Sequence, residues 1–179
     1  MTKTLVAGVG NIFLSDDAFG VEVVRAMAGT PVPEGFEVVD FGIRGVHLAY
    51  QLLEGYDTLV LIDAAPRGHA PGTVSLLEVD QAQVVDAADA VTEGQSPLVD
   101  AHGLEPGAIL SMLGSLGGQV SRVLVVACEP ASVEEGLGLS PAVEAAVPQA
   151  VELVQQVMQA GSAPATHVPA DRTEKEVSR

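Results

Sequence analysis

Short aliphatic runs alternate with helical patterns along most of this chain, and this alternation constrains its fold more than any other feature. One run, at 59–62, reads Leu-Val-Leu-Ile and is apolar on both faces, as is typical of strands buried between two layers of helices. Strands that alternate with helices predict βαβ units and a mostly parallel sheet. We therefore expect one α/β domain of three layers, in which a central, mostly parallel twisted sheet is flanked by helices on both faces. The predicted strands are 4–9, 36–41, 58–63, 73–78 and 123–128, and the predicted helices are 17–27, 46–53, 103–116 and 141–160.

The length of 179 residues suits a single domain with a sizeable apolar core. We place this domain at 1–160 and expect a disordered tail at 161–179, where the composition shifts to Ser, Ala, Pro and mixed charge. A polar loop is expected at 86–100. Because Pro148 interrupts the last helical pattern, we expect a kink or a restart there.

Charge and cysteine content exclude several classes of function. The chain has 24 acidic against 8 basic residues, so it repels phosphate backbones and anionic lipid, and we expect neither a nucleic-acid nor a membrane partner. The lone Cys128 excludes an internal disulfide and favours a buried thiol. With no span of about 18 apolar residues and no signal-peptide pattern, the sequence predicts a cytoplasmic protein, with a monomer as the default state.

A glycine turn follows the first predicted strand and leads to two acidic residues. Gly8 and Gly10 allow a sharp turn and a close backbone approach, and Asn11 tolerates the same geometry and can cap it. Asp16 and Asp17 then precede a helical pattern. Carboxylates at that place favour a helix N-terminus, but the carboxyl end of a strand is also where open α/β sheets bind ligands. Both carboxylates cannot face one point, so one of them is expected to be a cap or a solvated charge.

Three residues are candidates for chemistry because each follows a predicted strand or borders a loop at the same edge of the sheet. Asp17 follows the first strand, Asp63 ends the third, and His102 lies where the long loop meets a helix. Two carboxylates and one imidazole can bind a divalent ion such as nickel or zinc and leave positions open for water or substrate. Taken singly, Asp63 could instead cap the next element, and His102 could be an ordinary loop histidine.

A dinucleotide site is the first alternative, because a Gly-x-Gly follows the first strand and Asp40 ends the second. That fingerprint needs a third glycine for close packing of helix on strand, but Phe13 stands at its position. Asp16 and Asp17 would also repel a pyrophosphate. The pattern therefore agrees with a related fold but not with nucleotide chemistry.

The ordered set of motifs resembles the nickel–iron hydrogenase maturation endopeptidases. It comprises Gly8-x-Gly10-Asn11, Asp16-Asp17, Gly20, Asp63-Ala64, His102-Gly103-Leu104 and the stretch from Gly136 to Pro141. The similarity runs from about residue 4 to residue 160. It implies a protease that removes a C-terminal peptide from the precursor of the hydrogenase large subunit once nickel is in place.

The resemblance also implies roles for individual residues. Asp17, Asp63 and His102 correspond to the metal-contacting residues of the family. After the second strand, many members of the family carry Asp-Gly-Gly-Thr, whereas this chain reads Asp-Phe-Gly-Ile-Arg from Asp40 to Arg44. Asp40 is retained, Phe41 precedes Gly42, and Arg44 adds a cation. With Asn11, these loop residues are expected to contact the precursor, where Arg44 could meet a peptide carboxylate or an acidic surface.

Two mechanisms fit this ligand set. A bound metal could activate water for attack on the scissile carbonyl, or nickel already held by the precursor could be gripped as a recognition element. The chain lacks the His-Glu-x-x-His pattern of a tightly held zinc, which favours nickel supplied by the substrate. The competing class is an acidic α/β module that binds a cation or basic peptide without cleaving it.

Overall fold

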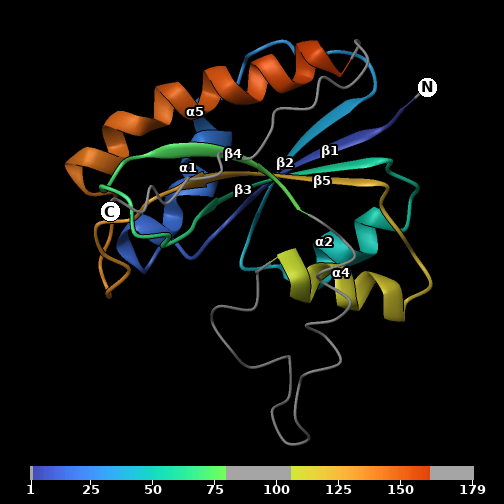
Figure 1. The fold of residues 1–179 in the computed structure, drawn as a ribbon, viewed down its shortest axis with the longest axis horizontal. Helices are drawn as coiled ribbons and strands as arrows, with labels where there is room; N and C mark the ends of the chain where they lie inside the picture. Colours follow the sequence, from blue (N-terminus) through green and yellow to red (C-terminus); the bar gives the residue numbers. More distant parts are fainter. Residues whose placement is uncertain (1, 80–105, 162–179) are drawn as a thin grey trace, which may run out of the picture.

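Among the residues that the structure describes, four parallel strands and one antiparallel edge strand form the sheet (Figure 1). The computed structural model describes residues 2–79 and 106–161. The strand order is β2-β1-β3-β5-β4. The neighbours β2 and β1, β1 and β3, and β3 and β5 run parallel, whereas β4 is antiparallel to β5. The strands span Thr4–Val9 (β1), Phe36–Gly42 (β2), Thr58–Ala64 (β3), Val74–Glu78 (β4) and Arg122–Cys128 (β5).

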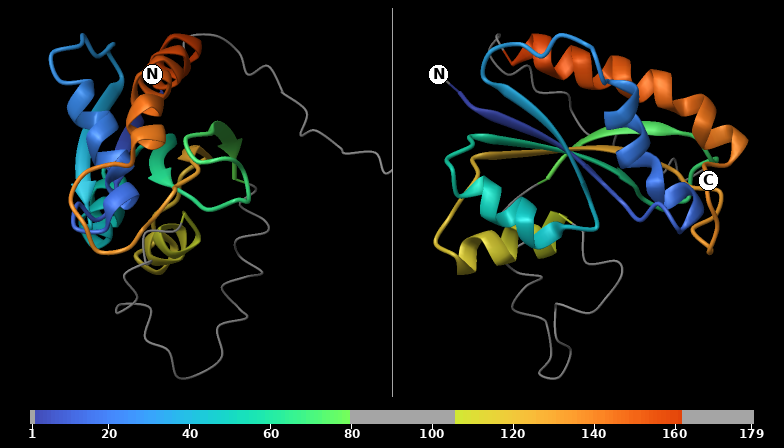
Figure 2. Two further views of the ribbon diagram at one scale, coloured as in Figure 1. Left: turned by 90° about the vertical axis from the view of Figure 1, so that its left-hand side faces the viewer. Right: turned by 180° about the vertical axis from the view of Figure 1, so that it is seen from behind.

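Helices cover both faces of the sheet, as Figure 2 shows from two further sides. Helices α1 (Phe19–Ala26) and α5 (Pro141–Ala160) lie on one face, and α2 (Gly45–Leu52) and α4 (Pro106–Ser115) lie on the other. Because side chains alternate along a strand, β1 contributes to two cores. Leu5 packs in the cluster that contains Leu48 of α2, and Val6 packs in the cluster that contains Phe19 of α1. The expected three-layer α/β architecture is confirmed.

The observed elements agree closely with those expected from the sequence, with two exceptions. The predicted start of the first helix is instead a short 3-10 helix, η1 (Ser15–Ala18), and the α-helix begins at Phe19. The last helix continues as one element through Pro148, so the expected restart is wrong. The loop at 86–100 and the tail from 162 onward lie outside the described residues, as do the first three residues of the helix predicted at 103–116.

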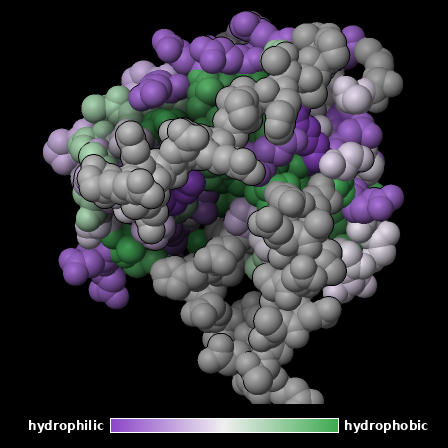
Figure 3. Space-filling view, in the orientation of Figure 1, coloured by the Kyte–Doolittle hydropathy of each residue, from purple (hydrophilic) through white to green (hydrophobic). Residues whose placement is uncertain are grey.

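The surface is mixed in character, and hydrophilic side chains line the outer side of α5 along the top of Figure 3. Val143, Ala150 and Val154 are fully buried on the opposite side of this helix, which is therefore amphipathic. No helix within residues 2–79 and 106–161 has both the length and the apolar character to cross a membrane.

Candidate functional site

Three glycines let the start of α1 pack directly on the strand ends. A Cβ on Gly10 would lie 1.7 Å from the carbonyl oxygen of Asp17, and one on Gly20 would lie 2.0 Å from that of Ile62. A Cβ on Gly8 would lie 2.4 Å from the carbonyl oxygen of Gly20. Such approaches exclude any side chain. In the dinucleotide fingerprint a third glycine allows the helix to pack closely on the strand, but Phe13 stands at that position here. Gly20, seven residues further along the chain, allows this close packing instead.

The turn after β1 fixes the position of Asp17. The backbone N–H of Asn11 donates to Asp17 Oδ2 at 2.7 Å, and the N–H of Phe13 donates to Asn11 Oδ1 at 3.0 Å. Asn11 thus caps the turn, as the sequence predicts. Asp17 is partly exposed, so its carboxylate is held by the backbone and yet accessible from outside.

Asp63 lies on the neighbouring strand at the same edge. It is the sixth residue of β3, in register with Ala127 of β5, and it is partly exposed. The preceding residue, Ile62, touches Gly20 through its carbonyl oxygen, so the segment that carries Asp17 packs against the end of β3. The fold brings Asp17 and Asp63 to one edge of the sheet. His102 lies outside the described residues, and its place beside them stays a prediction.

The loop after β2 is tied to the same turn. Asp40 is in register with Gly8, and the N–H of Gly10 donates to the carbonyl of Gly42 at 3.0 Å. Arg44 is exposed, but its guanidinium is engaged: Nε donates to the carbonyl of Phe41 at 3.0 Å, and Nη2 donates to the carbonyl of Asp40. Asp40 and Gly42 thus lie at the end of β2, and Arg44 follows it, next to the turn after β1 that contains Asn11.

Asp16 has a role that the sequence analysis missed. Its side chain is fully buried, so the expectation of a solvated charge does not hold for it. Oδ2 accepts N–H bonds from Ala131 (2.8 Å) and Ser132 (3.1 Å), and Oδ1 accepts one from Ser140 (2.6 Å), whose hydroxyl donates to Oδ2 at 2.9 Å. Burial alone would raise the pKa of Asp16, but these four donors outweigh it and hold the pKa below its usual value. Asp16 therefore anchors the loop between β5 and α5 to η1.

Glu129 anchors a second loop in the same way. It is buried at the end of β5 and accepts N–H bonds from Arg67 (2.7 Å) and Gly68 (3.3 Å). Burial opposes its charge, but the backbone donors of residues 67–69 prevail and lower the pKa of Glu129. Glu129 thereby fixes the loop that follows β3.

Cys128, next to Glu129, is buried as predicted. Burial, with the nearby charges of Asp16 and Glu129, raises the pKa of this thiol to about 11. Since the thiolate is the reactive form, Cys128 is an inert structural residue at neutral pH.

No local sequence pattern could have revealed the two anchors. Asp16 binds residues that are 115 to 124 positions away, and Glu129 binds residues about 60 positions away. From the sequence, Asp17 is assigned to chemistry and its neighbour Asp16 is left as a cap or a solvated charge, without the partners that Asp16 binds. Within residues 2–79 and 106–161, no group of three His, Cys, Asp or Glu side chains is arranged to hold a metal ion.

Comparisons with known proteins agree with this arrangement. The family model described as "Hydrogenase maturation protease" matches residues 21–157. The hydrogenase 2 maturation protease of Escherichia coli K12 is 33% identical over 154 residues, which cover 85% of this chain and 88% of that protein. The solved structure of the hydrogenase maturating endopeptidase HybD from E. coli superposes with a TM-score of 0.71 at 32% identity, covering 89% of this chain and 94% of that one.

A more distant structure supports the same assignment. The hydrogenase 2 maturation peptidase of a Thaumarchaeota archaeon has a TM-score of 0.63 at 27% identity, covering 88% of this chain and 98% of the other. The fold is that of an α/β protein that carries Asp17 and Asp63 at the carboxyl end of its sheet. The chain belongs to the hydrogenase maturation protease family, and this membership implies an endopeptidase.

Proposed function

We propose that this chain removes the C-terminal extension of a nickel–iron hydrogenase large-subunit precursor after nickel insertion, with the nickel in the precursor as the recognition element. The observation that carries the proposal is the convergence of Asp17 and Asp63 at one sheet edge, in a chain of the maturation protease family. We place the reaction in the cytoplasm and the enzyme in the monomeric state.

Asp17, Asp63 and His102 form the proposed grip on the nickel of the substrate. Carboxylate and imidazole donors suit a borderline divalent ion. Asp17 suits this role because the N–H of Asn11 orients its carboxylate through Oδ2, at 2.7 Å. Two carboxylates and one imidazole bind free metal less firmly than a site richer in imidazole or thiolate, which favours nickel that arrives with the precursor.

The loop after β2 is the proposed contact with the peptide chain of the precursor. Arg44 binds the carbonyls of Phe41 and Asp40 and so holds this loop in one conformation. Because its guanidinium is exposed and has five N–H donors, Arg44 keeps donors that can meet a carboxylate of the substrate. Asp40 and Gly42 at the end of β2, and Asn11 in the adjoining turn after β1, complete this proposed contact.

The proposal is tested by incubating the pure protein with a large-subunit precursor, with and without nickel loaded, and measuring intact mass. Loss of one C-terminal peptide from the nickel-loaded form alone is the expected result. Equal cleavage of both forms would show that nickel in the substrate is not the recognition element. The absence of cleavage from every precursor tried would favour a binding module instead.

A further inference from the structure

Four large apolar side chains are exposed on the two segments that Asp16 joins. We call Ile12, Phe13, Val133 and Leu137 the apolar rim. Phe13 and Leu137 are the most exposed of the four, at 64% and 79%. Single exposed apolar residues are common on protein surfaces, but a group of them beside a functional site marks an interaction surface.

The two segments of the rim are bonded together along their backbones. The N–H of Gly136 donates to the carbonyl of Phe13 at 2.9 Å, and the N–H of Ser15 donates to the carbonyl of Gly136 at 3.0 Å. The hydroxyl of Ser15 also donates to the carbonyl of Glu134 at 2.9 Å. Phe13 and Leu137 therefore flank a bridge between Leu14 and Gly136, and their backbones are fixed before any partner arrives.

A fixed backbone reduces the entropy lost on binding, so such a surface is preorganised. The rim is also continuous with the proposed site, since Phe13 donates its N–H to Asn11, which in turn donates to Asp17. A protein whose scissile segment reaches Asp17 therefore approaches the turn that carries Phe13. Two exposed acidic residues, Glu134 and Glu135, lie between Val133 and Gly136, which gives the rim a negative border.

We propose that the apolar rim docks the hydrogenase precursor through an apolar surface of that protein bordered by basic residues. This inference rests on the proposed function and extends it, because it assigns affinity for the precursor to residues outside the nickel grip. Aromatic and aliphatic anchors supply most of the affinity in such interfaces, whereas the acidic border accelerates association and favours a basic partner.

The test compares Phe13→Ser/Leu137→Ser with a control, Val32→Ser/Tyr50→Ser, which removes apolar side chains that are also exposed, at 43% and 56%. Val32 precedes β2 at the opposite end of the sheet, and Tyr50 lies in the last turn of α2. Binding and cleavage of the nickel-loaded large-subunit precursor are measured for the unaltered chain and both variants. We expect the rim variant to raise the Kd and KM by about tenfold or more, with kcat and melting temperature unchanged. We expect the control variant to leave the Kd and KM unchanged.

Each outcome is decisive. Cleavage by the unaltered chain with equal Kd for the rim variant would overturn the docking inference alone. Binding without cleavage, weakened by the rim variant, would support docking while contradicting the proposed function. If the unaltered chain neither binds nor cleaves the precursor, the proposed function and the docking inference are both overturned. As a second measurement, Glu134→Gln/Glu135→Gln should reduce the salt dependence of the association rate, and an unchanged dependence would contradict a basic border on the partner.

Discussion

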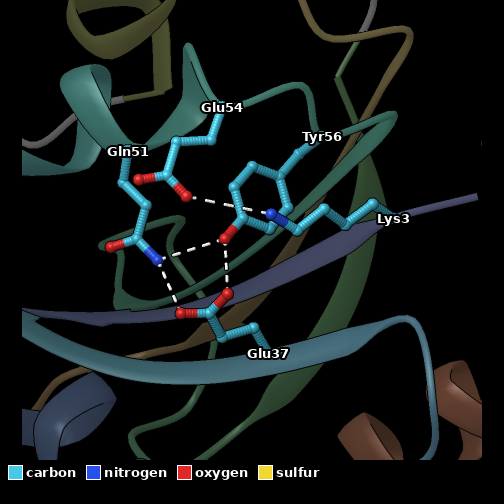
Figure 4. Close-up of polar contacts among 5 residues, drawn as sticks. All are labelled: Lys3, Glu37, Gln51, Glu54 and Tyr56. Carbon is cyan, nitrogen blue, oxygen red and sulfur yellow. Dashed lines mark hydrogen bonds and ion pairs between the residues drawn. The ribbon is translucent and has the colours of Figure 1, made fainter.

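The two ends of the sheet use polar side chains in different ways. At the amino end, side chains bind one another (Figure 4): Glu37 accepts from Gln51 Nε2 at 2.8 Å and from the Tyr56 hydroxyl at 2.5 Å, and Lys3 lies 4.0 Å from the Tyr56 ring centroid and 3.8 Å from Glu54. At the carboxyl end, Asp16, Asp17 and Glu129 bind backbone N–H groups of loops. Side-chain pairs join neighbouring elements, whereas carboxylates bound to backbone determine the shape of loops.

This difference explains why the carboxyl end can hold a site. Loops usually move more than the elements they connect, and catalytic groups need a fixed geometry. Carboxylates bound to several N–H groups provide that rigidity without occupying the exposed surface. At the amino end, burial raises the pKa of Tyr56, and the adjacent Glu37 raises it further, so the phenol stays a neutral donor in a structural network.

The largest expected effect concerns glycines at the two ends. Gly10→Ala places a Cβ 1.7 Å from the carbonyl oxygen of Asp17, whereas a Cβ on Gly55, in the turn before β3, meets no atom within 4 Å. Both positions have positive φ, which costs about 1–2 kcal/mol for a side chain. We expect Gly10→Ala to lower the free energy of unfolding by about 3 kcal/mol or more and Gly55→Ala by only the backbone strain. Urea denaturation measures both, and equal losses would contradict the close packing.

The next effect comes from the anchor at the carboxyl end. Asp16→Ala leaves three backbone N–H groups and one hydroxyl, all in part-buried hydrogen bonds, without their acceptor. We expect a loss of about 2–4 kcal/mol in the free energy of unfolding, measured by urea denaturation. Glu37→Ala, at the exposed end of the Tyr56 network, is the matched control and should cost less than half as much. A loss for Asp16→Ala no larger than that of the control would show that the loop does not depend on Asp16.

Acid pH sharpens the same comparison. Because the pKa of Asp16 lies below its usual value of 3.8 in the folded state, its contribution to stability is present above pH 3.8 and is lost as the pH falls through the folded pKa. The stability difference between the unaltered chain and Asp16→Asn should therefore stay constant from about pH 6 to about pH 4 and shrink as the pH falls further. Thermal denaturation across this range measures it, and a difference that is independent of pH would argue against a charged anchor.

The smallest expected effect is at the amino end. Tyr56→Phe removes a hydroxyl that bonds Glu37 and Gln51, while the buried ring is kept. We expect a loss of about 1 kcal/mol in stability and no change in processing activity. A loss of activity at unchanged stability would mean that the two ends of the sheet are coupled.

The sequence predicted the fold well because each strand is a short, continuous apolar run that can be recognised locally. Runs such as Leu59-Val60-Leu61-Ile62 are buried on both faces, as expected. The placement of Asp17 and Asp63 at one edge followed from parallel topology alone. The anchors could not be predicted, because Asp16 acts on Ser140 across 124 positions. The predicted start of the first helix, at residue 17, was wrong because the chain forms a 3-10 turn there. This turn accompanies the close contact of Gly10 with the backbone of Asp17, which the apolar periodicity does not reveal.

We propose that the carboxyl end of the sheet processes a nickel-loaded precursor. The most direct test compares Asp17→Asn with Glu37→Gln, which makes the same chemical change, from carboxylate to amide, at opposite ends of the sheet. The asparagine retains an oxygen to accept the Asn11 N–H, so folding should persist, as thermal denaturation would verify. By intact mass of the nickel-loaded precursor, we predict at least about 100-fold slower cleavage for Asp17→Asn and an unchanged rate for Glu37→Gln. Equal rates for Asp17→Asn and the unaltered chain would contradict the account.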